Sequence, residues 1–253
     1  MMWLRMLPLT LAALLMQVPA SAQVAQGPTD QEPRPIRAEV RFNFAVGVPT
    51  GSFHDNIGHP GYGLNLFGGV RIPESPIMVG VDLGALVYGR SVDRVPFSQT
   101  VGPRVMVDVV TTNSILQPHM VLRLQPSQGT LRPYIDGLFG IKYLATSTSI
   151  QDDEYDDEDY EIASSTNFSD VALSGGVGTG LDIHVYQAQP TDALRTVSMH
   201  VGVQYLVGRR AEYLAEGELE DTNGNGVLDD EELDIRRSNT TLVQPQIGIT
   251  MQF

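Results

Sequence analysis

Large apolar residues alternate with small, polar or charged residues in eight segments of the chain. These segments cover 39–48, 62–72, 77–90, 105–124, 131–146, 169–186, 195–208 and 242–253. In the first segment, Val40, Phe42 and Phe44 alternate with Glu39 and Arg41. Every second side chain of a strand points to the same face, whereas a helix with about 3.6 residues per turn would mix the two sets. The pattern therefore predicts eight β-strands, each with one apolar and one polar face.

The polar faces combine glycines with side chains of both charges. They include Asn65, Arg71, Asp82, Arg90, Gln117, His119, Arg123, Asp136, Lys142, Asp182, His184, His200 and Gln204. A soluble lipocalin-like barrel would instead pack bulky apolar residues inside and expose long polar ones. Because the polar set suits a narrow lumen, the apolar set is expected to face lipid, where barrel closure satisfies every backbone group. The expected fold is all-β, an eight-stranded antiparallel up-and-down transmembrane β-barrel.

The connections between these segments alternate between short and long. Short ones cover 73–76, 125–130 and 187–194, and long ones cover 49–61, 91–104, 147–168 and 209–241. Outer-membrane barrels have short periplasmic turns and longer extracellular loops. With an even number of strands, both chain ends are expected on the periplasmic side and the long loops outside the cell.

The N-terminus has the pattern of a cleaved export signal. Arg5 precedes an apolar run that ends at Met16, and Ala20-Ser21-Ala22 resembles a cleavage site. The run is too short to cross a bilayer as a helix, which needs about 20 apolar residues. We therefore expect a signal peptide at 1–22, a short periplasmic segment at 23–36 and the barrel at 37–253.

The acidic charge of the chain is concentrated in two of the long loops. Eighteen of the 30 acidic residues lie within 151–161 and 212–234. The rest of the chain is nearly balanced, so the charge describes two loops rather than the barrel. Nucleic acid is an unsuitable partner for such a chain, whereas divalent cations suit it. The chain contains no cysteine, so disulfides do not contribute to its stability.

Several segments resemble the family of small outer-membrane β-barrel proteins of the outer-membrane protein A and W type. They are the export signal, Val46 to Phe53, Leu131 to Tyr134 and the terminal strand Gln246 to Phe253. The resemblance implies that the outer-membrane assembly machinery recognises the terminal Phe253. It also implies outer-membrane lipids and lipopolysaccharide as surroundings, in a Gram-negative bacterium.

Residues 221–232 read Asp-Thr-Asn-Gly-Asn-Gly-Val-Leu-Asp-Asp-Glu-Glu. This sequence matches the twelve-residue EF-hand calcium loop, D-x-[DN]-x-[DN]-G-x5-E, at every constrained position. The expected ligands are Asp221, Asn223, Asn225, the carbonyl of Val227, Asp229 through water, and a bidentate Glu232. The sequence predicts one Ca²⁺ site, in the weak extracellular range of about 10⁻⁴–10⁻³ M. The alternative interpretation is a solvated acidic turn without calcium.

The resemblance to an EF-hand is confined to this loop. Short helices are conceivable at 211–220, where Gly217 interrupts, and at 231–237, so a paired calcium switch is not expected. The other acidic run, 152–161, lacks glycine and fixed ligand spacing. We interpret it as a solvated loop, with loose cation binding as the alternative.

Three functions compete for the barrel. A structural or surface-interaction role, without enzymatic activity, fits balanced inward charges that fill a narrow lumen. A carrier or narrow channel for small apolar molecules would use Leu86, Leu138 and Leu144 near the outer end. A lipid-modifying enzyme is the third, but the strand register is expected to place no serine beside His119, His184 or His200. We interpret these histidines as hydrogen-bonding groups of the lumen.

Overall fold

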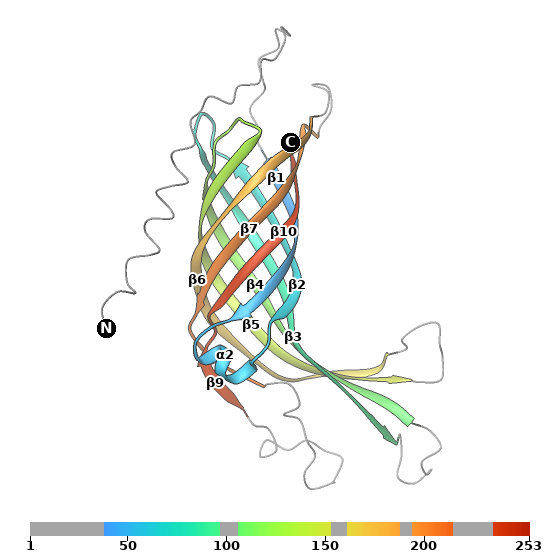
Figure 1. Cartoon of the computed structure of the whole chain (residues 1–253). Coiled ribbons are helices and arrows are strands. Elements are labelled where there is room, and N and C mark those ends of the chain that lie inside the picture. Colours follow the sequence, from blue (N-terminus) through green and yellow to red (C-terminus); the bar gives the residue numbers. More distant parts are fainter. Residues whose placement is uncertain (1–37, 97–105, 153–160, 188–193, 215–234) are drawn as a thin grey trace, which may run out of the picture. The chain divides into compact units, whose positions relative to one another are not determined.

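Eight strands close into an antiparallel barrel in the computed structural model (Figure 1). The structure describes residues 38–96, 106–152, 161–187, 194–214 and 235–253. The barrel strands are β1 (Ala38–Pro49), β2 (Gly61–Arg71), β3 (Ile77–Pro96), β4 (Met106–Leu124), β5 (Leu131–Asp152), β6 (Glu161–Gln187), β7 (Thr196–Gly208) and β10 (Leu242–Gln252). Each barrel strand pairs with the next barrel strand along the chain, so that β7 pairs with β10, and β1 pairs with β10 to close the barrel. The predicted all-β barrel and its eight strands are confirmed.

The first and last strands close the barrel edge to edge. The Ala38 amide donates to the Phe253 carbonyl at 3.3 Å, and the Phe253 amide donates to the Ala38 carbonyl at 2.9 Å. This closure lies at the end of the barrel where the strands are joined by short turns, here called the short-turn end. The opposite end is called the long-loop end. Within the described residues, no helix is both long and apolar enough to cross a membrane.

The two faces of the strands divide as the alternation predicts. On β1, Phe42 and Phe44 are 55% and 48% exposed, while the alternating residues Arg41 and Asn43 are buried. The exposed apolar residues of the wall include Leu64, Val81, Leu122, Phe139, Val177, Val201 and Ile249. Charged side chains therefore fill the lumen, and the barrel presents an apolar outer face.

Arg90 departs from the predicted division. The alternation places it in the lumen, but it is exposed. A register shift between Val87 and Gly89, where β3 pairs with β4, inserts one residue into the alternation. Beyond such a bulge the side chains exchange faces, which turns Arg90 outward.

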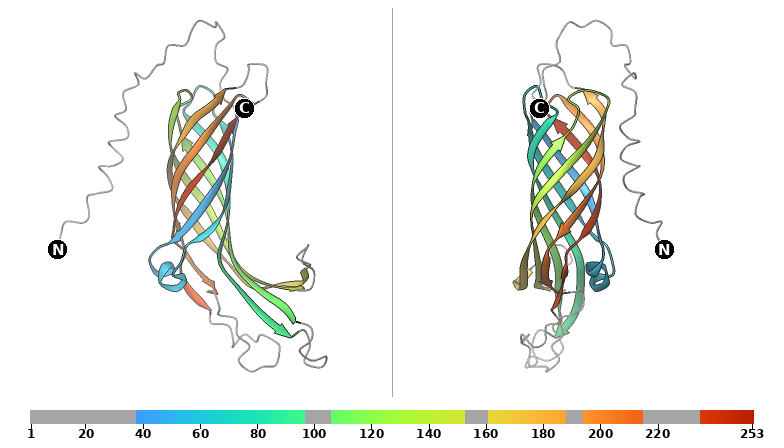
Figure 2. Two further views of the ribbon diagram at one scale, coloured as in Figure 1. Left: turned by 45° about the vertical axis from the view of Figure 1, so that its right-hand side comes forward. Right: turned by 90° about the vertical axis from the view of Figure 1, so that its left-hand side faces the viewer.

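Two hairpins continue beyond the barrel at the long-loop end. Pairing of β3 with β4 extends to Pro96 and Met106, and β5 pairs with β6 as far as Gln151 and Glu161. Because β4 also pairs with β5 out to Asp152, these extensions form one four-stranded sheet that bends away from the wall (Figures 1 and 2). The connections predicted at 91–104 and 147–168 are therefore partly strand.

The remaining described elements lie at the same end. Helix α2 (Ser52–Ile57) follows β1, and β8 (Arg210–Tyr213) pairs with β9 (Arg236–Asn239). Ala211 to Tyr213 and Arg236 to Arg237 are strand, so helix is wrong for these described parts of 211–220 and 231–237. Pairing between the two segments, which local sequence does not encode, determines their conformation.

Candidate functional site

The lumen is the polar site that the strands build, and its contents change along the barrel axis. Successive inward residues of β1 are Glu39, Arg41, Asn43 and Ala45. Along β1, charged residues thus lie toward the short-turn end, amides follow, and apolar residues lie toward the long-loop end. We call these three levels the arginine layer, the amide layer and the apolar cap.

The arginine layer consists of four arginines and three carboxylates. They are Arg41, Arg71, Arg123 and Arg132 with Glu39, Asp136 and Asp182, all of them buried. Arg123 donates to both oxygens of Asp136 at 2.7 Å and to Glu39 Oε1 at 2.7 Å. Arg41 donates to the same Glu39 oxygen at 2.8 Å and to Asp182 Oδ2 at 3.2 Å. Bidentate and shared ion pairs of this kind hold distant strands in one register.

Two aromatic rings enclose these guanidinium groups. Arg123 Cζ lies 4.2 Å from the Phe67 ring centroid and 4.1 Å from that of Tyr134. The Tyr134 ring fits here because Gly202 has no side chain: a Cβ at Gly202 would lie 2.5 Å from the Tyr134 hydroxyl. Cations over aromatic faces are favourable where water is excluded. The arginine layer is consequently packed as well as charge-paired.

The amide layer is a chain of hydrogen bonds across the lumen. Asn43 donates to Gln246 Oε1 at 3.1 Å and to Asn65 Oδ1 at 3.2 Å. Asn65 donates to Asp82 Oδ1 at 2.6 Å, and Gln204 donates to Asp82 Oδ2 at 3.3 Å. His200 joins this chain through Asn43 at 2.7 Å and reaches Tyr134 of the arginine layer at 2.7 Å. The predicted hydrogen-bonding role of His200 is confirmed.

A serine does lie beside His119, contrary to the prediction. His119 Nε2 is 2.9 Å from Ser174 Oγ, and His119 Nδ1 is 3.3 Å from the Gln117 carbonyl. His119 is paired in register with Gly140, and Gly140 with Ser174. Because Gly140 has no side chain, the imidazole reaches across it to the next strand. Strand register could have revealed this contact, had it been followed across two neighbouring strands.

This serine–histidine pair lacks other parts of a hydrolytic site. The imidazole Nδ1 faces a backbone carbonyl, whereas in a catalytic triad a carboxylate orients it. Both side chains are buried, at 2% and 3% exposure. The geometry therefore fits a hydrogen bond within the lumen better than a nucleophile that meets a substrate.

The apolar cap closes the long-loop end. Its members are Ala45, Phe53, Ile57, Leu86, Tyr88, Ile115, Leu144, Ala172, Ala211, Tyr213 and Leu242. Phe53 of α2 is fully buried and meets the Tyr213 ring edge-on, with centroids 5.1 Å apart. Tyr213 accepts a hydrogen bond from Asn56 Nδ2 at 2.8 Å, which ties the helix to the β8–β9 hairpin. Both elements thus pack onto the barrel mouth.

The apolar residues that suggested a carrier belong to this packed interior. Leu86 and Leu144 lie in the cap, while Leu138 joins Phe67, Met78, Val121 and Leu206 in a second buried cluster. Lys142, which lies between Leu138 and Leu144 along β5, donates to the backbone carbonyls of Leu206 and Thr240. Side chains of the protein itself therefore occupy the region in which a carrier would hold an apolar molecule.

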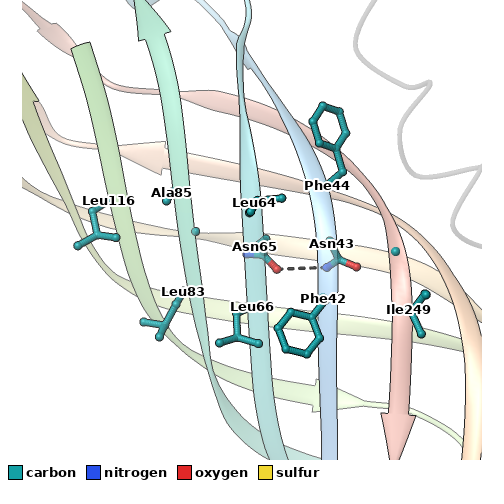
Figure 3. Close-up of a pocket in the computed structure, with 12 residues that line it drawn as sticks. Phe42, Asn43, Phe44, Leu64, Asn65, Leu66, Leu83, Ala85, Leu116 and Ile249 are labelled. Carbon is teal, nitrogen blue, oxygen red and sulfur yellow. Dashed lines mark hydrogen bonds between the residues drawn. The ribbon is translucent and has the colours of Figure 1, made fainter. Parts of the chain in front are cut away.

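A shallow apolar groove of about 510 Å³ lies on the outer wall. Figure 3 shows Phe42, Phe44, Leu64, Leu66, Leu83 and Ile249 around the hydrogen-bonded pair Asn43–Asn65. Asn43, Asn65, Gly84 and Gly248 are neighbours across four strands, and none of the four sends a side chain outward. The groove is thus the gap between two rows of outward apolar side chains.

The expected calcium ligands lie outside the described residues. Asp221, Asn223, Asn225, Val227, Asp229 and Glu232 all fall within 215–234, as does most of the loop that carries them. Among the residues that the structure does describe, no group of three His, Asp or Glu side chains could hold a metal ion.

Comparison with solved structures finds proteins of low sequence identity. Neisserial surface protein A is 12% identical over 85% of this chain and 97% of its own, with a TM-score of 0.41. The attachment invasion locus protein of Yersinia pestis is 12% identical over 87% and 100%, with a TM-score of 0.34. A major outer membrane protein of Thermus thermophilus is 13% identical over 85% and 99%, with a TM-score of 0.37. No protein-family model and no curated protein sequence matches the chain.

Proposed function

We propose that this protein is a small outer-membrane β-barrel with a structural and surface-interaction role rather than an enzymatic one. The apolar outer face carries the proposal. Met120 and Phe139 on neighbouring strands are 71% and 66% exposed, and comparable side chains surround the barrel. Exposure of apolar surface to water costs about 25 cal/mol per Å², so a face of this extent belongs in lipid. Outer-membrane lipids and lipopolysaccharide are its expected surroundings.

The filled lumen favours a scaffold over a channel. Ion pairs occupy the short-turn end, and α2 with the β8–β9 hairpin packs onto the other. A barrel of about eight strands has an interior only wide enough for its own side chains. The proposed role therefore rests on the surface at the long-loop end of the barrel.

The four-stranded extension is the surface that we propose for interaction. Hydroxyl and amide groups link its strands, with Thr111 and Thr148 Oγ1 atoms 3.2 Å apart and Asn167 donating to Thr148 at 2.7 Å. A sheet that leaves the membrane needs such polar faces, since both of its sides meet water.

Cysteine labelling tests this topology, because the natural chain has no cysteine. Val177 and Ser165 lie on the same strand, β6, with Val177 on the barrel wall and Ser165 exposed on the extension. A membrane-impermeant maleimide added to intact cells should label Ser165→Cys and leave Val177→Cys unlabelled. Labelling of Val177→Cys in the folded protein, or fractionation as a soluble product, would contradict the proposal.

We propose further that residues 221–232 bind one Ca²⁺. The agreement of all constrained positions with the loop pattern supports this proposal. Register pairs of β8 with β9, such as Tyr213 with Arg236, bring the two ends of segment 214–235 together. A loop held at both ends loses less conformational entropy when it closes around an ion. The strands β8 and β9 thus flank this loop, whereas two helices flank the calcium loop of an EF-hand.

Calorimetric titration of the folded protein with Ca²⁺ and Mg²⁺ tests the site. Glu232→Gln and Asp221→Ala should each weaken calcium binding at least about tenfold, because they remove charged oxygen ligands. Thr222→Ala is the matched control, since the second loop position supplies no ligand. Absence of heat at millimolar calcium, or unchanged affinity of the Glu232 variant, would remove the site.

The terminal Phe253 is proposed as the contact for the outer-membrane assembly machinery. Its backbone completes the barrel closure, while its side chain is 37% exposed. Deletion of Phe253 should lower the yield of folded barrel in cells much more than the yield of refolding in detergent. Equal losses in both would assign the residue to packing alone.

A further inference from the structure

The arginine layer leaves two of its four arginines without a carboxylate partner of their own. Arg132 Nη2 is 3.9 Å from Asp182 Oδ2, too long for a hydrogen bond. Among the described residues, Arg71 donates to Gln125 alone, to the backbone carbonyl at 2.8 Å and to Oε1 at 3.3 Å. Both side chains are more than nine-tenths buried. They differ in this respect from Arg41 and Arg123, which share the carboxylates.

Other donors already use the three carboxylates. Asp182 Oδ2 accepts from Gln125 Nε2 at 2.6 Å and from Arg41, and its Oδ1 accepts from Thr250 at 3.0 Å. Arg123 occupies both oxygens of Asp136. Glu39 receives Arg41, Arg123 and Gln252. Within the arginine layer, four guanidinium groups therefore face three carboxylates. The fourth buried carboxylate of the lumen, Asp82, accepts from Asn65 and Gln204 in the amide layer.

Four buried atoms of this region lack a partner among the described residues, and each can donate a hydrogen bond: Arg132 Nη1, Arg132 Nη2, Arg71 Nε and Ser198 Oγ. The other buried atoms without a partner among the described residues are amide atoms of Gln117, Gln204, Gln244 and Gln246. A buried donor that lacks an acceptor costs about 1–3 kcal/mol, and more when it is charged. A fold that retains four such donors in a layer with more guanidinium groups than carboxylates is suited to receive an anion.

These donors lie together at the short-turn end. Arg71 ends β2, Gln125 directly follows β4, and Arg132 is the second residue of β5. Gln125 contacts Arg71 and Asp182, and Asp182 neighbours Arg132 in register. Ser198 is paired in register with Thr250, which also contacts Asp182. The site is thus one connected group at the barrel mouth rather than scattered atoms.

We propose that the short-turn mouth binds a small oxyanion, a phosphate or a carboxylate, between Arg71 and Arg132. A planar guanidinium matches such groups with two parallel hydrogen bonds, and the Ser198 hydroxyl adds a third donor. The proposal concerns the lumen itself and does not depend on the membrane orientation proposed above. The anion comes either from solution or from a phospholipid headgroup at the rim of the barrel.

The wild-type protein provides the first test. Folded protein in maltoside micelles, labelled with ¹⁵N-arginine, is titrated with inorganic phosphate at constant ionic strength against chloride. The Arg71 Nε–Hε signal should shift and saturate at millimolar phosphate, because this N–H has no partner among the described residues. An unchanged Arg71 signal would overturn the proposal.

Variants locate the site. Arg132→Gln and Arg71→Gln should each weaken phosphate binding at least tenfold, and Arg132→Lys should lose part of it, because a lysine cannot bind in the bidentate manner. Arg90→Gln, on the exposed side of the bulge, is the control and should change the affinity less than twofold. The mobility of unheated protein in gel electrophoresis verifies folding of each variant. Equal affinities of all variants would refute the site, and the wild-type titration remains decisive where a variant does not fold.

Bilayers distinguish the two sources of the anion. In nanodiscs that contain phosphatidylglycerol, a headgroup ligand should shift the Arg71 signal without added phosphate. A free oxyanion should shift it only when phosphate is added. Either result supports the site and identifies its source, whereas no shift under both conditions would overturn the proposal.

Discussion

Single residues maintain the charged lumen through contacts that leave few alternatives. Arg123 makes three hydrogen bonds at 2.7 Å to two carboxylates and lies between two aromatic rings. Buried charges of this kind stabilise a fold only while every partner is present. The lumen is thus sensitive to the loss of any one of these side chains.

Removal of that guanidinium should destabilise the barrel strongly. Arg123→Met leaves Asp136 without its bidentate partner and should lower the free energy of unfolding by about 3–5 kcal/mol. Urea unfolding in detergent micelles measures the loss. Arg90→Met, on the outside of the bulge, is the matched control and should change stability by less than about 0.5 kcal/mol. Similar losses in both variants would mean that the ion pairs add little.

Gly140 lies so close to the neighbouring strand that its α-hydrogen cannot be replaced by a methyl group without a clash. A Cβ there would lie 2.1 Å from the Pro118 carbonyl oxygen and 2.7 Å from His119 Cα, both backbone atoms. Gly140→Ala should therefore cost about 3 kcal/mol, the upper end for overpacking, and should break the contact of His119 with Ser174. A Cβ at Gly68 would meet no atom within 4 Å. The control variant Gly68→Ala should therefore unfold at the same urea concentration as the wild type. Equal urea midpoints for Gly140→Ala and Gly68→Ala would contradict close packing at Gly140.

Helix α2 shows how a short element can close a mouth. Six residues are too few for a stable isolated helix. Positive φ angles at Gly51 and Gly58, of 61° and 75°, start and end it, and the Gly58 amide donates to the His54 carbonyl at 2.8 Å. Its stability therefore comes from Phe53 and Ile57, which are buried in the apolar cap.

Truncation of Phe53 should open this element without unfolding the barrel. Phe53→Ala removes a fully buried ring, a change that typically costs about 3–5 kcal/mol, and here the cost should appear as local opening. Amide hydrogen exchange at Gly58 should accelerate at least tenfold, while amides in the barrel strands stay protected. His54→Ala, on the exposed side of the same helix, should leave exchange unchanged. Acceleration throughout the barrel would show that the cap is not a separate unit.

The whole molecule combines an apolar exterior with a filled interior. Planar-bilayer recordings should accordingly show little or no conductance. Phe53→Ala should remain non-conducting as well, because the arginine layer persists below the cap. Large and stable channels in the wild type would contradict the filled lumen and favour a pore function.

The sequence by itself determined the strands and the direction in which their side chains point. Period-two alternation is local, so Phe42, Phe44 and their equivalents could be assigned outward and Arg41, Arg123 and Asp182 inward without any knowledge of neighbours. The proposed calcium loop also rests on the sequence alone, since all its expected ligands fall within twelve consecutive residues.

Only the tertiary structure decided which side chains meet. The bulge that turns Arg90 outward arises from pairing between β3 and β4, and the contact of His119 with Ser174 spans three strands. The strands β8 and β9 form because distant segments pair, where local sequence suggested helix. The unequal sharing of carboxylates, in which Arg71 and Arg132 donate no hydrogen bond to a carboxylate of the described residues, depends on distances across the lumen. Such distances follow from barrel closure, and closure joins residues that are far apart in the chain.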